Sequence, residues 1–590
     1  MTTVDTSYDT DWLVIGSGFG GSVSAMRLAE KGHDVTVLER GEHFRNEDEM
    51  PTSSWDLKKW LYMPRAGLRG LFKLTFFKDV FVMSGAGVGG GSLVYAMTLY
   101  VPPRAFFEDR QWSTIADWQA ELAPHYETAQ RMLGVTDVID DDPADQLLKE
   151  YAGEIGVEDT YRKARVGTYL DTPGEEVADP YFGGEGPARM GCSRIGRCML
   201  GCPQGSKNSL DKNYLWFAQR DGATVRAGRE VVSLRAVNGT DGADGWDVVH
   251  ERTGSRLRRD RQTTRARGVV VSGGALGTNE LLARCKLQGD LPKVSDRLGH
   301  LVRTNSEAIL VVTVPEGRAE ALAKRVAITS SIYPDPHTHI ETVTYGAGGG
   351  AIRNLFTVLT GGGNRVTRPL KWLGQLVRHP GWVAELLLKP RWGERSIVVL
   401  VMQSLDNSMQ LTARRRRNGR VKLQTRQDPD NPNPTFIPAA NAFTEWLARK
   451  TGGAPGSAVP EALLSIPTTA HILGGAPIGS TPAYGVIDEQ HRVFGYENLL
   501  VCDGAAIPAN VGVNPSLTIT AMTERAIDHV PAKDPAAKVH HRGRTAFSGK
   551  TASGEPEPLP ISLTLEGAVE EQAAPDAAAA RRRSKSTAAQ

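Results

Sequence analysis

The chain has 590 residues, more than one hydrophobic core supports, so two joined domains are expected. Hydrophobic residues make up 40% and charged residues 23% of the chain, and a formal net charge of +2 gives no global attraction to nucleic acid. No secretory signal is visible before the first predicted strand, and no apolar run approaches the roughly 20 residues of a membrane span. We therefore expect a cytoplasmic protein without a nucleic-acid partner.

The first predicted elements are a strand, a helix and a second strand within residues 11–38. Gly16, Gly18 and Gly21 fill a G-x-G-x-x-G pattern between the first strand and the helix, and Glu39 ends the second strand. In this setting the pyrophosphate of a dinucleotide lies at the helix N-terminus, and the acidic side chain accepts hydrogen bonds from ribose hydroxyls. Because Glu39 would repel a 2′-phosphate, the unit predicts FAD or NAD and disfavours NADP.

A second glycine-rich run covers residues 84–93, with the sequence SGAGVGGGSL. No strand–helix crossover surrounds it, so we expect it to wrap a different part of the same ligand. Further strand patterns at residues 268–272 and 498–502 each run into a glycine turn. A nucleotide-binding domain assembled from these distant pieces must be discontinuous in sequence.

Several segments resemble the glucose-methanol-choline (GMC) oxidoreductase family, whose members carry FAD. The family resemblance lies in residues 85–92, 503–505 and 510–516, and that to its bacterial cholesterol oxidase group lies in residues 87–94, 468–475 and 512–515. It implies a discontinuous Rossmann-like FAD-binding domain joined to an α+β substrate-binding domain with a large antiparallel sheet, in the α/β class. It also implies oxidation of the 3-hydroxyl of a sterol, with oxygen or another carrier as the electron acceptor.

The domain boundaries follow from these motifs and from composition. The expected FAD-binding domain comprises residues 1–45, 80–110, 215–300 and 466–530, and the substrate-binding domain comprises residues 46–79, 111–214 and 301–465. From residue 531 the chain turns to alanine, proline, glycine and charge, which bury too little apolar area to order a segment. We therefore expect residues 531–590 to be a disordered tail.

Three residues are candidates for the chemistry. His471 lies between a threonine pair and a glycine pair, and an imidazole with a pKa near 6.5 suits transfer of the alcohol proton. Asn514 precedes Pro515 at the start of a predicted helix, so it faces the flavin by resemblance or serves as an N-cap. The resemblance also implies that Glu341 carries a proton during isomerisation of the 5,6 double bond, whereas a glutamate in a polar strand is as often a surface residue.

Motifs and resemblance together predict a non-covalent FAD site and no metal. Its expected residues are Gly16, Gly18, Phe19, Gly20, Gly21, Glu39, Gly87, Gly89, Gly90, Gly91, Ser92, Val231, Asp503, Gly504, Asn514 and Ser516. Two positions depart from the family pattern: Tyr95 replaces an asparagine expected near the flavin, and Ser516 replaces a frequent aromatic residue. The lost asparagine, together with a cysteine-rich loop, favours an alternative, a dehydrogenase for another hydrophobic alcohol with a non-oxygen acceptor.

A cysteine-rich loop leaves a second alternative open. Cys192, Cys198 and Cys202 match the ferredoxin spacing except that Ile195 stands at its second position. Three thiolates cannot complete a four-cysteine site, so a buried structural loop is favoured. An iron–sulfur centre with one substituted ligand, in a membrane-associated electron-transfer flavoprotein, is the remaining reading.

Two segments interleave basic residues with aromatic ones, at residues 58–78 and 365–395. Such a pattern suits the headgroup region of a membrane, from which a sterol substrate would be drawn. It equally suits helices that pack tryptophan into the core and expose basic faces. The sequence leaves peripheral membrane contact and internal packing as equal alternatives.

Overall fold

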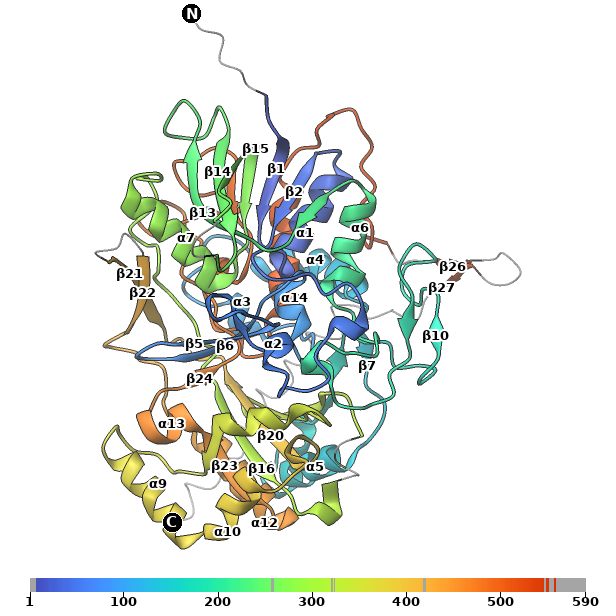
Figure 1. Ribbon diagram of the computed structural model, residues 1–590, viewed down its shortest axis with the longest axis vertical. Coiled ribbons are helices and arrows are strands. Elements are labelled where there is room, and N and C mark those ends of the chain that lie inside the picture. The colour runs from blue at the N-terminus through green and yellow to red at the C-terminus, as the bar shows by residue number, and fades with distance from the viewer. Residues whose placement is uncertain are drawn as a thin grey trace, which may run out of the picture.

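The computed structural model describes residues 7–255, 259–319, 322, 324–416, 421–545, 548–550 and 556–558. Figure 1 shows one large sheet at the top and a second large sheet at the bottom, with helices between and around them. Among the described residues, none of the helices combines the length and the apolar character needed to cross a membrane.

The upper sheet has β1 at its centre, parallel to both of its neighbours, β2 and β15. The strands are β12 (Thr224–Arg226), β2 (Val35–Leu38), β1 (Thr10–Ile15), β15 (Gln262–Val271), β14 (Trp246–Arg252) and β13 (Arg229–Ala236), and β25 (Leu499–Val501) adds in parallel to β15. All six side chains of β1 are buried, as expected for a central parallel strand. The main helices of this region are α1 (Phe19–Glu30), α7 (Gly274–Gln288) and α14 (Ser516–Asp528).

The lower sheet has seven strands, and every strand pairing in it is antiparallel. Its order is β19 (Phe356–Val358), β23 (Ala454–Ala458), β16 (Ala308–Thr313), β20 (Ser396–Gln403), β18 (Thr338–Val343), β17 (Ile328–Asp335) and β8 (Arg162–Lys163). Helices α5 (Pro143–Glu154) and α12 (Pro438–Thr451) bury one face of this sheet in a core of their own. The opposite face packs toward the upper sheet, in a core that the two regions share. The exact domain boundaries stay a prediction.

Smaller elements connect the two sheets. The other α-helices of the described residues are α2 (Leu57–Trp60), α3 (Arg104–Phe107), α4 (Trp118–Met132), α6 (Tyr214–Arg220), α9 (Thr367–Arg378), α10 (Pro380–Val383), α11 (Trp392–Arg395) and α13 (Val459–Leu464). A three-stranded sheet joins β24 (Thr468–Thr469), β6 (Phe81–Gly85) and β5 (Phe72–Phe76). The strand pairs are β3 (Tyr62–Met63) with β4 (Leu68–Arg69), β7 (Thr136–Asp137) with β9 (Arg165–Val166), β10 (Glu176–Val177) with β11 (Arg189–Met190), β21 (Met409–Arg415) with β22 (Val421–Gln427), and β26 (Ser548–Lys550) with β27 (Pro556–Pro558).

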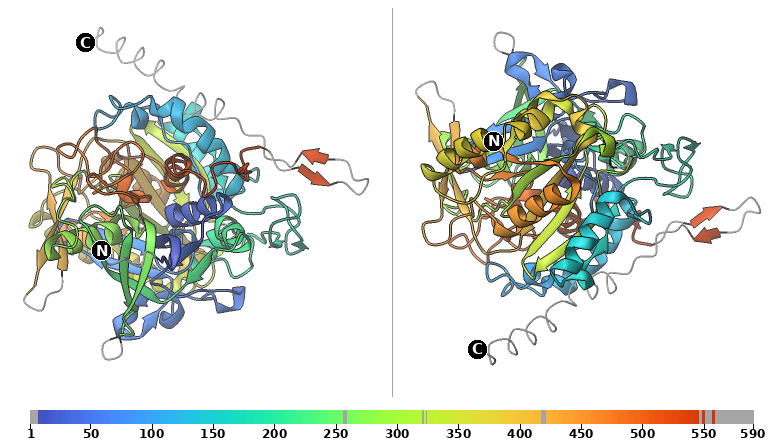
Figure 2. Two further views of the ribbon diagram at one scale, coloured as in Figure 1. Left: turned by 90° about the horizontal axis from the view of Figure 1, so that it is seen from above. Right: turned by 90° about the horizontal axis from the view of Figure 1, so that it is seen from below.

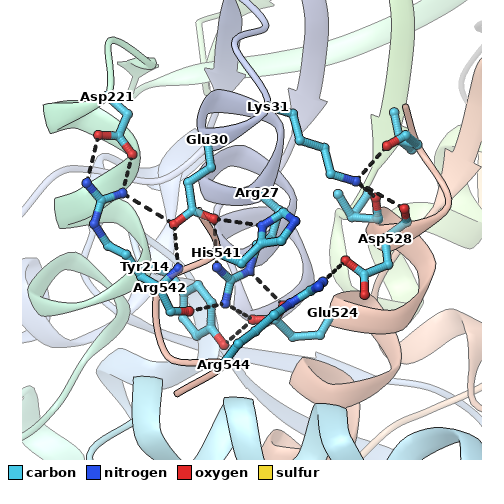
Figure 3. Close-up of polar contacts among 12 residues, drawn as sticks. Arg27, Glu30, Lys31, Tyr214, Asp221, Glu524, Asp528, His541, Arg542 and Arg544 are labelled. Carbon is cyan, nitrogen blue, oxygen red and sulfur yellow. Dashed lines mark hydrogen bonds and ion pairs between the residues drawn. The ribbon is translucent and has the colours of Figure 1, made fainter. Parts of the chain in front are cut away.

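A buried ion pair joins three helices that lie far apart in sequence. The guanidinium of Arg27 on α1 donates two hydrogen bonds to Glu524 on α14, at 2.7 and 2.8 Å. The hydroxyl of Tyr214 on α6 donates to the same carboxylate at 2.6 Å. Figure 3 shows these side chains converging between the helices. Since all three are buried, the charges are stabilised mainly by each other, and the ion pair fixes how the helices pack.

Residues 531–545 run back over the C-terminal end of α1, although the composition predicts disorder from residue 531 onward. The backbone N–H of Arg542 donates to Glu30 at 3.1 Å, and its guanidinium donates to Glu30 at 3.3 Å and to Asp221 at 2.6 Å. His541 also contacts Glu30, at 3.2 Å (Figure 3). The segment is ordered because the buried Glu30 carboxylate needs cations, which composition does not reveal. The prediction for residues 559–590 lies outside the described residues.

Candidate functional site

The glycines of the first turn differ in their surroundings: some pack against other backbone, and one faces open space. A Cβ at Gly16 would lie 2.2 Å from the carbonyl oxygen of Ser272, and one at Gly20 would lie 1.6 Å from that of Cys502. These two glycines let α1 approach the neighbouring strand ends closely, and Gly21 packs against the carbonyl of Gly16 within the turn. A Cβ at Gly18 would meet nothing within 4 Å, because this residue faces a cleft. The turn therefore presents backbone at the N-terminus of α1, where an anion is stabilised.

Glu39 lines the same cleft, in a cavity of about 150 Å³ that also includes Val231. Its carboxylate accepts hydrogen bonds from the backbone and hydroxyl of Ser17, at 3.1 and 2.8 Å, and from the backbone of Gly41 at 2.7 Å. A carboxylate offers about four acceptor positions, so these contacts orient the group and leave capacity for a ribose hydroxyl.

The second glycine run packs directly on the first. A Cβ at Gly90 would lie 2.6 Å from the Cα of Gly18, so the two turns are in backbone contact. Gly90 and Gly91 line the cleft. Gly87, Gly89 and Ser92, by contrast, are not among its lining residues. The Ser92 hydroxyl donates to the carbonyl of Gly89 at 2.8 Å, which holds the loop in shape.

The cleft continues into a cavity of about 280 Å³. Both cavities are lined by Gly18, Arg40, Gly85, Gly91, Ser272, Gly273, Gly274 and Gly277, which makes them one elongated space. Of the predicted site residues, Phe19, Gly20, His471, Asp503, Gly504, Asn514 and Ser516 line the second cavity. Its far end is apolar, with Ile309, Ile328, Val343, Val398 and Leu400 in its wall.

His471 is held by a residue that the sequence did not single out. Oε1 of Glu307 contacts Nδ1 of His471 at very short range, and Oε2 of Glu307 accepts the backbone N–H of Ala470 at 2.7 Å. Glu307 is fully buried, so its charge acts on the imidazole with little screening by solvent. A proton on Nδ1 faces Glu307, which directs Nε2 away from it. The only signal in the sequence is a glutamate directly before the apolar strand β16.

Asn514 and Glu341 form a second polar pair. The side-chain amide of Asn514 donates to Oε2 of Glu341 at 3.4 Å. Among the described residues, neither Oδ1 of Asn514 nor Oε1 of Glu341 has a hydrogen-bond partner. Burial raises the pKa of Glu341 to about 8, against the Asn514 hydrogen bond, which lowers it; the charge of Glu307 adds a smaller upward effect. Glu341 is therefore neutral at pH 7, and it lies behind Asn514 rather than in the cleft wall.

Asp503 closes the cleft by joining two turns. Its carboxylate accepts hydrogen bonds from the backbone of Gly274 at 2.9 Å and from that of Ala505 at 2.8 Å. Burial raises the pKa of Asp503 to about 6, while these hydrogen bonds and that of Thr278 act in the opposite direction. Asp503 thereby fixes the start of α7 against the turn that precedes α14.

Two cations along the cleft were also missed in the sequence. Arg40 follows Glu39 directly, and Lys73 on β5 lines the cavity beside it. Burial lowers the pKa of Lys73 to about 7, and the charge of Arg40 acts in the same direction. A phosphate-bearing ligand would stabilise the charged form of Lys73. The open Gly18, the oriented Glu39, the two cations and the unpaired Asn514 oxygen together fit a dinucleotide such as FAD.

Tyr95, one of the two departures from the family pattern, has a clear structural role. Tyr95 lines the cavity, packs edge-on against Phe19 and donates its hydroxyl to the carbonyl of Asn208 at 3.1 Å. In the cysteine loop, Lys207 donates to the carbonyl oxygens of Cys198 and Leu93, each at 2.8 Å. Within the described ranges there is no group of three or more histidine, cysteine or acidic residues placed to hold a metal ion.

Comparison with known proteins gives two family matches. Residues 11–324 match the family described as FAD dependent oxidoreductase, and residues 436–523 match the one described as GMC oxidoreductase. A cholesterol oxidase of Mycobacterium tuberculosis (strain H37Rv) is 48% identical over 89% of this chain and 92% of its own length. A cholesterol oxidase of Acinetobacter baumannii is 44% identical over 89% and 95%.

More distant matches have other alcohol substrates in their names. A 2-methyl-1,2-propanediol dehydrogenase of Mycolicibacterium austroafricanum is 24% identical over 90% of this chain and 96% of its own. Among solved structures, pyridoxine 4-oxidase from Mesorbium loti has a TM-score of 0.55 at 14% identity, covering 88% of this chain and 99% of that one. At such low identity the structural likeness bears on the fold alone.

Proposed function

This chain belongs to the GMC oxidoreductase family and uses FAD, and on that premise we propose that it oxidises the 3-hydroxyl of a sterol to the 3-ketosteroid. The observation that carries the proposal is the contact of His471 with the buried Glu307, because this imidazole lines a cavity whose wall is largely apolar. The two relatives named cholesterol oxidase, at 44% and 48% identity, support the sterol as substrate. Because sterols reside in bilayers, we also propose that the protein meets its substrate at a lipid surface.

When bound, FAD accepts the hydride that leaves the carbinol carbon. We assign removal of the hydroxyl proton to Nε2 of His471, because Glu307 occupies Nδ1. The carboxylate then stabilises the positive charge that the imidazole acquires, as well as fixing its orientation. Asn514 lines the same end of the cleft and has an unpaired Oδ1 in the described structure, so it is placed to orient the substrate oxygen.

We propose isomerisation of the 5,6 double bond as a second activity, with Glu341 as the proton carrier. Its raised pKa, about 8, suits a carboxyl that both takes and returns a proton. Since Glu341 lies behind Asn514, the amide side chain must turn aside before the carboxyl reaches C4 of the steroid. Glu341→Gln is expected to leave oxidation intact and stop isomerisation, measured by the ultraviolet absorbance of the 4-en-3-one. Loss of both activities would contradict this assignment.

The decisive test of the main proposal is anaerobic reduction of the bound flavin. Detergent-dispersed cholesterol is expected to bleach the flavin absorbance, whereas its 3-epimer and linear long-chain alcohols are expected to do so at least about tenfold more slowly. Bleaching by the linear alcohols but not by cholesterol would overturn the sterol assignment. Failure of every alcohol to bleach the flavin would remove the proposed chemistry altogether.

Tyr95 favours a second candidate function, that of a GMC dehydrogenase for a different hydrophobic alcohol. The tyrosine fills the cavity wall where the family pattern predicts an asparagine near the flavin. A bulky group there limits the space that oxygen needs next to a reduced flavin. Stoichiometric hydrogen peroxide during aerobic turnover would identify an oxidase, and turnover only with an added quinone or dye would identify a dehydrogenase.

A further inference from the structure

Helix α9 and the turn after it expose an unusual set of large aliphatic side chains. The exposed fractions are 71% for Val366, 66% for Leu370, 53% for Leu373, 76% for Val377 and 73% for Leu388. The first four are spaced by four, three and four residues, so they form one stripe along the helix. Contiguous apolar surface of this kind marks an interaction site in a folded protein.

The opposite side of α9 is anchored, so the stripe cannot turn inward. The indole N–H of Trp372 donates to the hydroxyl of Thr357 on β19 at 2.8 Å, and Leu376 packs against the main core. Arg368 is buried, and its guanidinium donates to the carbonyl of Thr435 at 2.6 Å. The apolar stripe is therefore a fixed feature of the surface.

Positive charge flanks the stripe. Residues 361–395 contain seven arginines or lysines, of which Arg368 and Arg395 are buried, and two acidic residues, Glu385 and Glu394. Both glutamates are already paired with cations of the same segment, Glu385 with Arg395 and Lys389, and Glu394 with Arg391. Lys371 and Arg378 each follow a residue of the stripe by one position, which places both on the same flank of α9.

We propose that this α9 surface, the stripe Val366, Leu370, Leu373 and Val377 with its flanking Lys371 and Arg378, docks the protein on a bilayer that contains anionic lipid. Aliphatic side chains enter the acyl boundary while lysine and arginine reach the headgroup phosphates. A second copy of the chain fits less well, because a twofold contact would bring two positively charged segments together. This docking proposal rests on the proposed sterol oxidation, because a sterol substrate would come from the membrane.

The location of α9 agrees with this role. Figure 1 places α9 and α10 at the end of the molecule opposite the nucleotide-binding sheet, and the view from below in Figure 2 shows this yellow segment on the outer side. A bilayer touching this end would leave the nucleotide-binding sheet in water.

The test is flotation of the purified, FAD-loaded full chain with sterol-free vesicles of phosphatidylcholine, with or without phosphatidylglycerol. The wild type is expected to float with the anionic vesicles. Leu370→Glu with Leu373→Glu is expected to weaken this binding by about a hundredfold or more, since two leucines no longer enter the bilayer. Lys371→Gln with Arg378→Gln is expected to weaken it about thirtyfold, and high salt is expected to act similarly.

Ile139→Glu is the matched control, because Ile139 is 83% exposed, lies outside the α9 surface, and is followed by Asp140 and Asp141, which pair with Arg194 and Lys163. It is expected to float like the wild type. All variants are expected to oxidise detergent-dispersed substrate normally, so a failure of the proposed function is seen separately from a failure of docking. Equal flotation of wild type and the α9 variants, no flotation of the wild type, or lipid-free dimerisation abolished by the same changes would each overturn the proposal.

Discussion

Replacing Glu341 by glutamine is expected to change how the stability of the protein depends on pH. In the folded state the pKa of Glu341 is raised to about 8, against an ordinary value of 4.5, chiefly because it is buried. Between these values the folded protein keeps a proton that the unfolded chain releases. The stability that this group contributes is therefore fully present below 4.5 and is lost as the pH rises toward 8.

The magnitude follows from the size of the shift. Each unit of pKa difference corresponds to about 1.4 kcal/mol, so the wild type gives up about 3 kcal/mol at pH 7 relative to a chain without this carboxyl. Glutamine keeps the shape and the hydrogen-bonding capacity but does not titrate. Glu341→Gln should thus gain stability over the wild type steadily between pH 5 and pH 8, by about 4 kcal/mol in total.

Urea unfolding followed by tryptophan fluorescence, at several pH values and with FAD in excess, measures this difference. Glu461 provides the matched control, because burial raises its pKa to about 8 as well, and it lies outside the cleft wall. Glu461→Gln should remove a similar share of the pH dependence. If the stability curves of wild type and Glu341→Gln run parallel across the range, the carboxyl ionises normally and the argument fails.

Three further changes test the site and the fold. Glu307→Gln should slow flavin reduction roughly a hundredfold or more while flavin is retained, measured by stopped-flow absorbance, and unchanged rates would remove Glu307 from the proton path. Gly18→Ala should fold but bind FAD weakly, because its Cβ would point into the cleft, whereas Gly20→Ala should not fold stably; equal FAD binding by folded forms of both would contradict the geometry. Arg542→Ala should lower the free energy of unfolding by about 2 kcal/mol, since it leaves Glu30 with fewer cations, and an unchanged denaturant midpoint would show that residues 531–545 contribute little.

The backbone unit that carries the first glycine turn could be predicted from local sequence. Gly16 to Gly21 and Glu39 occupy a strand–turn–helix–strand unit, whose backbone geometry follows from a few neighbouring residues. The sequence could not distinguish an open glycine such as Gly18 from a packing glycine such as Gly20, because the difference lies in which distant carbonyl stands opposite.

Side-chain pairs between distant segments could not be predicted from the sequence. Glu307 meets His471 only because β16 and the loop after β24 lie side by side, and nothing near Glu307 in the chain indicates this. Glu341 was predicted in the site, yet the fold places it one hydrogen bond behind Asn514. Residues 531–545 were expected to lack structure because composition indicates only how much apolar area a segment can bury. It does not indicate that the segment binds a buried carboxylate elsewhere in the fold, here Glu30.

The arrangement of the upper sheet has a consequence for how the protein is made. Its central strand β1 (Thr10–Ile15) is synthesised long before β25 (Leu499–Val501), which pairs with the neighbouring strand β15. Pairing of such distant segments carries a high entropic cost and makes folding slow. Asp503 and α14, which complete the cleft, follow β25 directly. The cofactor can therefore be captured only after β25 and α14 have been synthesised, so a shortage of FAD would leave this sheet exposed to chaperones and proteases.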